Sequence, residues 1–397
     1  MQIRRTATII IEPDSDLLAT LDTSQHVKQV LSPIAFNDGK PLGAIALQRK
    51  AYTIVKGTLN SQMTISAIRQ VSAAYASAKR NKHKVTKPFA FKRKSALFLV
   101  GKRGRDADFR SDGTLSIWTV GGRKKLRYTV PEVFQELFRR AKTIDSLNVI
   151  ERGGKLIGRV AMTIDVPDPQ GILPVGVDLN ETNALVAITT DDQVLFVSGR
   201  AVKIRNQRTR KTRGRVQRKL ATRKAEKRDT RSVRRLLKRL GRKQSNRTRT
   251  FAQETAKQLV RWAPKRSVLV FEDLDIPQPQ KGKIRGAHCR RRLSQWPRGL
   301  ILQWVRNKAE EVGIVVATVD PRYTSQNCSR CGLRGKRARH RFSCPSCGFE
   351  DHSDINAARN IRNRYTVSRD GGPLSTGPEA RASAAGKPPA ARRGVVD

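Results

Sequence analysis

Acidic residues are scarce in this sequence, and their scarcity narrows the partners that the protein can have. The 397 residues hold 33 Asp and Glu against 81 Lys and Arg, a formal net charge of +48. A surplus this large exceeds what solubility requires and predicts a polyanionic partner, most simply nucleic acid. An RNA-binding protein of ribosomal type would carry the same charge. An anionic membrane surface is disfavoured, because the basic residues are spread along the whole chain.

Long apolar runs and spare cysteines are also missing. No run approaches the 18 residues of a membrane span, and the apolar stretch within residues 1–13 is too short for a signal peptide. Four of the five cysteines form two CxxC pairs, and Cys289 stands alone in a basic, polar segment as a spectator thiol. This usage is typical of a reducing compartment. We therefore expect a soluble, intracellular protein.

The first half of the chain alternates between strand and helix patterns. Residues 1–15 are rich in β-branched side chains and predict a strand, whereas 16–84 show apolar residues at helical spacing. Residues 85–165 return to short strands, with one helix after Pro131. We expect these strands to form one barrel or sheet into which the helices are inserted. Three prolines within 166–174 mark a domain boundary.

Residues 166–365 predict an α/β domain with a ribonuclease-H-like sheet, which opens with a strand, a turn and two further strands. A buried strand follows at 267–274. The Pro-, Gly- and Arg-rich segment 277–299 has the composition of a mobile lid. In 366–397, Gly, Pro, Ala and Ser dominate, and this composition predicts a disordered tail.

A basic insertion at 203–263 interrupts this domain. Its first part, 203–249, holds 22 Lys and Arg against two acids, yet apolar residues recur at helical spacing. The periodicity favours a helical hairpin with a packed stripe over a disordered basic arm, with possible breaks at Gly214 and at Asp229–Thr230. Its basic faces would line a nucleic-acid channel, where phosphates are neutralised without sequence readout. The candidate nucleic-acid-binding residues are Arg208, Arg210, Arg213, Arg215, Arg218, Arg223, Arg231, Arg234, Arg235 and Arg239.

The two CxxC pairs predict a metal site within residues 325–350. Cys328 and Cys331 are separated from Cys344 and Cys347 by 12 residues. Four thiolates at this spacing can bind one tetrahedral Zn²⁺, and a site closed by four cysteines is structural rather than catalytic. An iron–sulfur cluster or redox-active pairs remain weaker alternatives.

Three acids stand at the ends of apolar elements in this basic chain. Asp178 ends a strand, Glu272 ends the strand at 267–274, and Asp354 begins a helix seven residues after the last cysteine. Converging carboxylates repel one another unless cations lie between them, and Mg²⁺ prefers oxygen ligands. Two such ions can activate water and stabilise the leaving oxygen of a phosphodiester. Asp273 and Asp275 could compete as ligands, but alternation turns Glu272 away from Phe271.

These motifs together resemble a known family. GVDLN, LVFEDL, YTSQNCSRCG, FSCPSCG and SDINAARNI, with the lead-in WPRGLILQWVRNKAEEVGI, resemble the RuvC-like nuclease of TnpB proteins, which are transposon-encoded RNA-guided DNA endonucleases related to compact type V CRISPR effectors. The resemblance is specific over roughly 170–365. Over 1–165 only the pattern of a barrel with a helical insertion is compatible. Asn180 departs from the family, which often has glycine there, and we expect a changed turn.

The resemblance implies roles for these residues. Asp178, Glu272 and Asp354 correspond to the catalytic acids that bind two Mg²⁺ ions, and Cys328, Cys331, Cys344 and Cys347 to the ligands of one structural Zn²⁺. It implies a guide RNA and a double-stranded target DNA with a displaced strand as partners, no membrane, and a monomer on one guide RNA. It also implies a wedge-like barrel (1–15 and 85–165), a helical recognition insertion (16–84), and action at the nucleoid of a prokaryotic cytoplasm.

Other functions remain open at this point. The chain could be a nuclease-inactive RNA-guided repressor, a compact CRISPR effector, a strand-transferring transposase or a ribosomal-type RNA binder. The complete set of three acids argues against a decayed nuclease. A ribosomal-type RNA-binding protein would not explain why acids stand at the ends of apolar elements on either side of a zinc ribbon.

Overall fold

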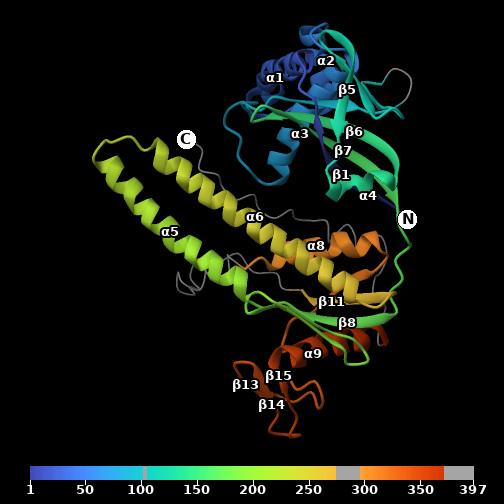
Figure 1. Ribbon diagram of the computed structural model, residues 1–397, viewed down its shortest axis with the longest axis vertical. Helices are drawn as coiled ribbons and strands as arrows, with labels where there is room; N and C mark the ends of the chain where they lie inside the picture. Colours follow the sequence, from blue (N-terminus) through green and yellow to red (C-terminus); the bar gives the residue numbers. More distant parts are fainter. Residues whose placement is uncertain (102–104, 274–295, 371–397) are drawn as a thin grey trace. The chain divides into compact units, whose positions relative to one another are not determined.

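The computed structural model describes residues 1–101, 105–273 and 296–370, and the chain divides into two compact units at residue 166 (Figure 1). The expected lid at 277–299 falls largely outside the described residues. No helix in the described ranges has the length and apolar character needed to cross a membrane. Each unit is described by itself.

The N-terminal unit is built on one antiparallel sheet of seven strands. Its order is β2-β6-β7-β1-β5-β4-β3, so the first strand of the chain lies near the middle. The two edge strands meet at a bridge between Val100 and Ala107, where the Gly101 amide donates to the Ala107 carbonyl at 3.1 Å. The sheet is therefore nearly closed into a barrel. The strands are β1 (Gln2–Ile11), β2 (Ser95–Leu99), β3 (Ala107–Phe109), β4 (Thr114–Thr119), β5 (Gly122–Thr129), β6 (Ala141–Arg152) and β7 (Lys155–Asp165).

Three helices are inserted between β1 and β2, as the periodicity predicted. They are α1 (Ser15–Phe36), α2 (Ala44–Val55) and α3 (Ser61–Arg80), with a short turn of 3₁₀ helix, η1 (Asn37–Gly39), after the first. α1 begins after Asp14, whose carboxylate accepts a hydrogen bond from the Leu17 amide at 2.7 Å. Asn60 caps α3 in the same way through the Met63 amide at 2.8 Å. Their buried faces share one core with β1, β2 and β7.

The region around α4 (Glu132–Arg139) differs in part from the prediction. The helix after Pro131 is present, but a 12-residue strand, β6, begins only two residues after it ends. That strand was not predicted. Its buried residues do not alternate regularly, because the pairing with β7 shifts register twice, at Ala141/Thr143 and at Ile144/Ser146.

The C-terminal unit contains a mixed five-stranded sheet of order β10-β9-β8-β11-β12. The first three strands form an antiparallel meander, and β8, β11 and β12 run parallel. The predicted opening of a strand, a turn and two further strands is present. The bounds are β8 (Leu173–Asp178), β9 (Asn183–Ile188), β10 (Val194–Ser198), β11 (Ser267–Glu272) and β12 (Val315–Val319).

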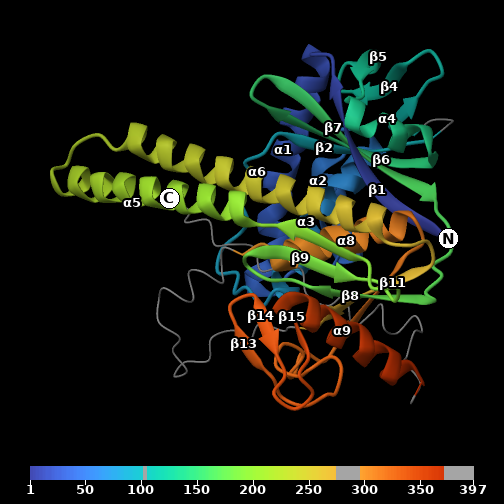
Figure 2. The same ribbon diagram turned by 60° about the horizontal axis from the view of Figure 1, so that its bottom comes forward.

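Helices cover both faces of this sheet. α6 (Arg231–Trp262) and α8 (Arg298–Glu311) pack on one face, where Ala256, Ile301 and other apolar residues form a core with the odd-numbered residues of β8 and β11. α9 (Ser353–Asp370) covers the other face through Ile361 and Tyr365 (Figure 2). The predicted disorder from residue 366 is wrong for 366–370, which continue α9. Residues 371–397 lie outside the described part.

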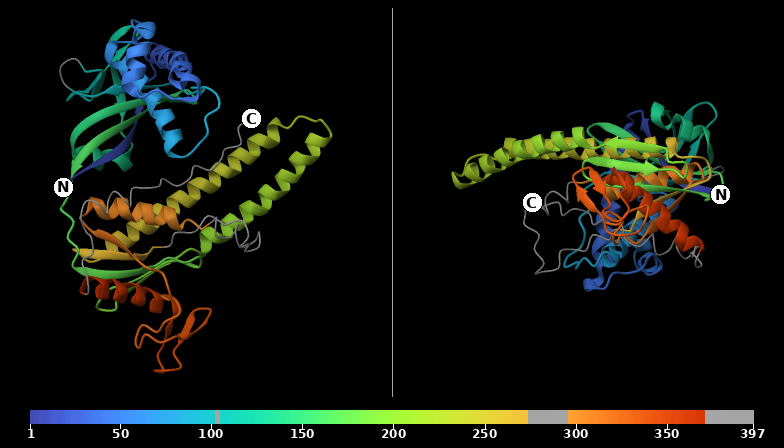
Figure 3. Two further views of the ribbon diagram at one scale, coloured as in Figure 1. Left: turned by 180° about the vertical axis from the view of Figure 1, so that it is seen from behind. Right: turned by 90° about the horizontal axis from the view of Figure 1, so that it is seen from below.

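The basic insertion is a helical hairpin made of α5 (Arg200–Ala225) and the first half of α6 (Figure 3). The two helices run antiparallel, and the turn between them includes Asp229 and Thr230, as expected. Gly214 does not break α5, since the helix continues through it. Of the predicted apolar stripe only Val233 is buried, and its other members are half-buried. The hairpin is therefore thin and presents most of its surface to solvent.

The cysteine-bearing segment forms a small antiparallel sheet of β13 (Lys336–Ala338), β14 (Arg341–Ser343) and β15 (Glu350–His352). β15 leads directly into α9. Consequently the cysteine module and the helix that carries Asp354 are one continuous piece of chain.

Candidate active site and metal centre

Two of the predicted acids end neighbouring strands of the C-terminal sheet. β8 ends at Asp178 and β11 at Glu272, and the strands are parallel, with Val177 opposite Phe271. Val177 and Phe271 belong to the core beneath α6 and α8. Alternation therefore turns both acids toward the face that α9 covers. This packing agrees with the expectation that Glu272 points away from Phe271.

The third acid reaches the same face because α9 lies directly on the backbone of β8. A Cβ atom at Gly176 would stand 1.9 Å from the carbonyl oxygen of Ala358, a distance that no side chain could tolerate. Glycine at this position thus permits the close approach of helix and strand. Asp354 lies in the first turn of α9 and is only 1% exposed.

The three carboxylates are close enough for Glu272 and Asp354 to act on the pKa of Asp178. Burial raises the pKa of Asp178, the carboxylates of Glu272 and Asp354 raise it further, and the result is about 7. Hydrogen bonding from Asn180 and the charge of Arg337 oppose the shift. A carboxyl group whose pKa is raised by neighbouring carboxylates is stabilised in its charged form by a cation that binds among them. The donor set, made only of carboxylates, fits a hard divalent ion such as Mg²⁺.

Asp354 has two side-chain partners that the sequence did not suggest. Asn183 donates from Nδ2 to its Oδ2 at 2.9 Å, and Arg337 donates from Nη2 to its Oδ1 at 2.8 Å. Arg337 comes from β13 of the cysteine module, 17 residues before Asp354. A single arginine in a chain with this many basic residues carries no signal of its own, so only the fold could identify it.

Glu272 is held from two sides. Its carboxylate accepts a hydrogen bond from the Thr324 hydroxyl, and its carbonyl oxygen accepts one from Nη2 of the buried Arg298 at 3.1 Å. Its neighbour Asp273 is exposed, and Asp275 lies outside the described residues. The preference for Glu272 over Asp273 thus has a geometric basis.

Asn180, the departure from the family pattern, shapes the turn after β8. Its Oδ1 accepts hydrogen bonds from the amides of Thr182 and Asn183 at 2.9 and 2.8 Å, and its Nδ2 donates to Asp178 at 3.4 Å. The side chain therefore closes the turn and orients the acid beside it.

The four cysteines converge in one cluster. Their sulfur atoms all lie within 4.8 Å of one another, with Cys328 and Cys347 at 3.7 Å and Cys331 and Cys344 at 3.5 Å. A tetrahedral Zn²⁺ with Zn–S bonds of about 2.3 Å would separate its sulfur atoms by about 3.8 Å. The donor set and its spacing therefore fit zinc.

Two asparagines of α9 attach this centre to the acids. Asn356, which is fully buried, accepts from the Ser329 amide at 2.9 Å and donates to the Asn327 carbonyl at 2.8 Å, on either side of Cys328. Asn360, one turn later, donates to the carbonyls of Asn327 and Thr324 at 2.7 and 2.8 Å. The sequence does contain a signal for this role, since asparagines four residues apart are unfavourable within a helix unless they have partners.

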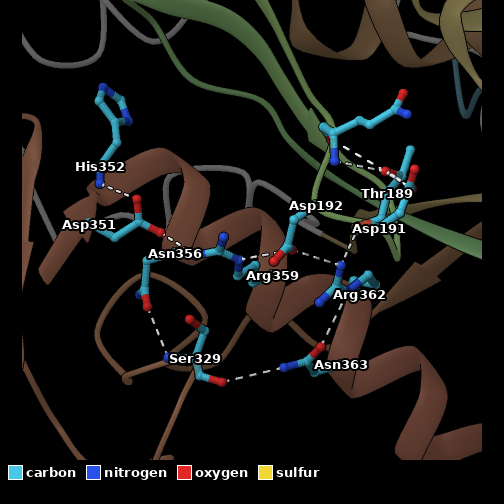
Figure 4. A network of polar contacts seen from close by, with 11 residues as sticks. Thr189, Asp191, Asp192, Ser329, Asp351, His352, Asn356, Arg359, Arg362 and Asn363 are labelled. Carbon is cyan, nitrogen blue, oxygen red and sulfur yellow. Dashed lines mark hydrogen bonds and ion pairs between the residues drawn. The ribbon is translucent and has the colours of Figure 1, made fainter. Parts of the chain in front are cut away.

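A further polar network connects α9 with the turn between β9 and β10 (Figure 4). Arg359 contacts Asp351 and, at 3.3 Å, Asp192, and Arg362 reaches the Thr189 carbonyl. Asp192 has a positive φ of 58° and lies at the tip of that turn. These contacts hold α9 along the sheet and therefore fix its first turn, where Asp354 lies.

His340 and His352 also lie near Asp354. Their rings stack at 5.3 Å, and ligand atoms of the two histidines and Asp354 fall within 4.8 Å of one another. From the sequence, both histidines lie near the cysteines and have no evident role. His352 also accepts a hydrogen bond at Nδ1 from the Asp354 amide at 3.2 Å, which helps to start α9.

Eight of the ten arginines predicted to bind nucleic acid are exposed on the hairpin. The exceptions are Arg213 and Arg223, which are half-buried and donate within the hairpin, to Gln244 at 3.4 Å and to Ser232 at 3.3 Å. On α6, Arg235 and Arg239 line a shallow hollow together with two further basic residues. These exposed charges lie on a surface with few acids.

Comparison with known proteins gives two family matches. Residues 159–282 match the family described as "Probable transposase" (OrfB of IS605), and residues 299–361 match the Cas12f1-like TNB domain. A TnpB-like protein of Aquifex aeolicus is 33% identical over 132 residues, which cover 31% of this chain and 42% of that protein. The chain is similar to TnpB-like proteins over these parts of its length. This confirms the resemblance seen in the motifs.

The other matches agree with this similarity. The CRISPR-associated endodeoxyribonuclease Cas12f1 of Sulfoacidibacillus thermotolerans is 47% identical over 72 residues, 17% of each chain. The aligned part thus spans less than half of either curated relative. A solved mini-RNA-guided endonuclease, CRISPR-Cas phi3, superposes with a TM-score of 0.52 at 12% identity, covering 94% of this chain and 93% of that one. Together with the sheet order, this likeness confirms the predicted RuvC-type fold.

Proposed function

We propose that this TnpB relative is an RNA-guided, Mg²⁺-dependent DNA endonuclease. The observation that carries the proposal is the convergence of Asp178, Glu272 and Asp354 on one face of a RuvC-type sheet, where burial first and the two other carboxylates second raise the pKa of Asp178 to about 7. Burial of these carboxylates and the repulsion between them are costs to the fold unless the site has a cation to bind. The relatives Cas12f1 and CRISPR-Cas phi3 are described as an endodeoxyribonuclease and an RNA-guided endonuclease.

The three carboxylates would hold two Mg²⁺ ions, which supply an activated water and charge stabilisation at the leaving oxygen of a phosphodiester. The protein's own part is to orient the ligands. Thr324 and Asn183 fix one oxygen each of Glu272 and Asp354, and Asn180 orients Asp178. Arg337 pairs with Asp354 and keeps a positive charge at the edge of the site, where a phosphate would arrive.

Sequence choice would come from base pairing with a guide RNA, while the protein binds the backbones. The net charge of +48 and the exposed arginines of the α5–α6 hairpin support the role of the protein in binding the phosphate backbones. In the N-terminal unit, we assign residues 1–15 and 85–165 to a wedge-like barrel and 16–84 to a recognition insertion. In the rest of the chain, we assign 166–365 to the nuclease domain, with 203–263 as a nucleic-acid channel.

The structural metal would be one Zn²⁺ bound by Cys328, Cys331, Cys344 and Cys347. Four sulfur ligands would fill the tetrahedral coordination of the ion. The ion would therefore stabilise the module and not take part in the reaction. We place the protein's action in a prokaryotic cytoplasm, on nucleoid DNA.

The test is to purify the protein from cells and sequence the RNA that accompanies it. The guide segment of that RNA is then exchanged, and plasmid cleavage is measured with Mg²⁺. We expect cleavage to follow the new guide. Absence of bound RNA would refute the guided mechanism, and bound RNA with guide-directed binding but no cleavage would instead identify a repressor. An RNA transcribed from a CRISPR array, rather than from a transposon end, would identify a compact CRISPR effector.

Strand transfer is a second candidate, favoured by the description of the matching family as a probable transposase. The same plasmid assay separates the two. Cleavage leaves free ends, whereas a transposase would join an added donor end to the target. We expect free ends only.

A further inference from the structure

Two histidines of the cysteine module form a cluster with one of the acids, and the proposed cleavage reaction does not need these histidines. Ligand atoms of His340, His352 and Asp354 lie within 4.8 Å of one another. Imidazole nitrogens favour borderline divalent ions such as Zn²⁺, whereas Mg²⁺ prefers oxygen ligands. The cluster therefore differs in its metal preference from the three carboxylates.

The backbone of the cysteine module holds the two histidines side by side. His340 lies in the turn between β13 and β14, and its carbonyl accepts a hydrogen bond from the Ser353 amide at 2.8 Å. His352 ends β15 and pairs in register with Arg341, the residue that follows His340. The two imidazole rings stack at 5.3 Å with 19° between their planes, and the Phe196 ring meets the His352 ring nearly at right angles at 5.2 Å. Ligands fixed in this way lose little freedom when an ion binds.

The carboxylate of Asp354 has one oxygen near the histidines and one near Arg337. Oδ2 lies 4.0 Å from Nδ1 of His352, whereas Oδ1 accepts a hydrogen bond from Arg337 at 2.8 Å. Oδ2 also accepts from Asn183, but a carboxylate oxygen has two lone pairs, so one remains for an ion. The arginine and the ion would thus contact different oxygens of the same carboxylate.

The distances suit a tetrahedral ion. Zn²⁺ with bonds of about 2.1 Å places a nitrogen and an oxygen ligand about 3.4 Å apart, so the Nδ1–Oδ2 distance of 4.0 Å would shorten by about 0.6 Å. Nδ1 of His352 already presents its lone pair to the Asp354 amide, at 3.2 Å, which is the long end of the usual range for a hydrogen bond. His340 is exposed, so an ion can enter from solvent and keep a water as its fourth ligand.

We propose that His340, His352 and Asp354 bind one Zn²⁺ ion in addition to the ion of the four cysteines. Asp354 belongs to this site and also to the three carboxylates of the proposed Mg²⁺ site. Zinc and magnesium therefore compete for one carboxylate, and zinc at the histidines inhibits DNA cleavage. The inhibition rests on the proposed nuclease function, whereas binding of the ion does not.

Binding is tested by calorimetry on the full-length protein that already holds one zinc ion per chain, without Mg²⁺ or nucleic acid. We expect a second Zn²⁺ ion to bind. His340→Ala should weaken its binding at least about 10-fold, since loss of even an outer partner of a metal ligand costs 10- to 100-fold. This variant keeps the carbonyl that Ser353 contacts. His83→Ala is the matched control, because His83 is also exposed but lies outside the cluster, and it should leave binding unchanged.

His352→Asn separates metal binding from the structural role of this side chain. The amide oxygen of asparagine can accept the hydrogen bond from the Asp354 amide, but it is a poor ligand for zinc. We expect weaker binding of the second ion at an unchanged thermal midpoint. If the unsubstituted chain binds no second ion, or if His340→Ala and His352→Asn bind it as tightly as the unsubstituted chain, the site is overturned. The second of these results would assign the ion to the three carboxylates alone.

Competition with Mg²⁺ tests the shared carboxylate. A large excess of Mg²⁺ should weaken binding of the second zinc ion. In guide-directed plasmid cleavage, each variant is compared with its own rate without added zinc, and His340→Ala should need at least about 10-fold more zinc than the unsubstituted chain for the same inhibition. Equal sensitivity of the two would overturn the competition for Asp354. A protein that binds the second ion as expected but cuts no DNA with any guide would refute the nuclease function and leave the zinc site standing.

Discussion

Asn356→Ala is the substitution that tests how the cysteine module is joined to the acids. Asn356 is fully buried and makes two hydrogen bonds to the backbone around Cys328, with Ser329 as donor and Asn327 as acceptor. Each bond contributes about 1 kcal/mol, and the half-buried Ser329 amide loses its partner altogether. The Asn327 carbonyl keeps a bond from Asn360. We therefore expect the attachment of the module to weaken by about 2–3 kcal/mol.

The weakening should appear in two measurements. Zinc affinity, measured by competition with a chromophoric chelator, should fall by roughly 30- to 150-fold, because binding and local folding are linked. The thermal midpoint of the C-terminal unit should fall by roughly 4–12 °C, given about 2–4 °C for each kcal/mol in a unit of this size. The zinc content of the cysteine module at saturation should stay near one per chain.

Asn363→Ala is the matched control, since Asn363 reaches the carbonyl of the same Ser329 but at 3.5 Å and in an exposed position (Figure 4). It should change stability by less than about 0.5 kcal/mol. If the two alanine variants release zinc and unfold alike, the buried asparagine does not join the module to α9, and the coupling between metal centre and acids is refuted.

Two further predictions concern charge. In Mg²⁺-free buffer that leaves zinc bound, the free energy of unfolding should fall by up to about 4 kcal/mol as pH rises from about 4 to 7. The reason is that Asp178 in the folded protein, with its pKa of about 7, holds a proton that the unfolded chain has already released. Asp178→Asn should remove this slope in thermal midpoints and stabilise the protein at pH 8; an unchanged slope would show that a group other than the buried Asp178 titrates. Replacing Arg234, Arg235 and Arg239 with glutamine should weaken DNA binding for every sequence and lower the salt slope by about 0.7–0.9 for each phosphate that is no longer neutralised. A changed sequence preference would instead show that the hairpin reads bases.

Much of the C-terminal unit was predictable because its signals are local. Strand alternation in β11 predicted the face of Glu272, and the CxxC spacing predicted that the four cysteines meet in one cluster. Helical spacing correctly predicted the hairpin even in a segment dominated by positive charge. In each case a short stretch of sequence carries the whole physical reason for the structure.

What the sequence did not reveal depends on distant contacts. Arg337, Asn183 and Thr324 are ordinary polar residues until the fold brings them to Asp354 and Glu272. β6 was not predicted, because its register shifts disturb the alternation of buried and exposed residues that is typical of a strand.

The central claim is that three carboxylates hold the metal ions with which the protein cuts DNA. Substitution of the two acids at the end of β11 tests this claim most directly. Glu272 and Asp273 are adjacent, but only Glu272 lies among the acids, and Asp273 is exposed. Single-turnover cleavage of a guide-matched plasmid is compared for Glu272→Gln and Asp273→Asn, with RNA binding measured for both. We predict that Glu272→Gln cuts at least about 1,000-fold more slowly, since it removes a metal ligand worth several kcal/mol, while Asp273→Asn cuts normally and both bind RNA. Cleavage by Glu272→Gln within about tenfold of Asp273→Asn would contradict the claim.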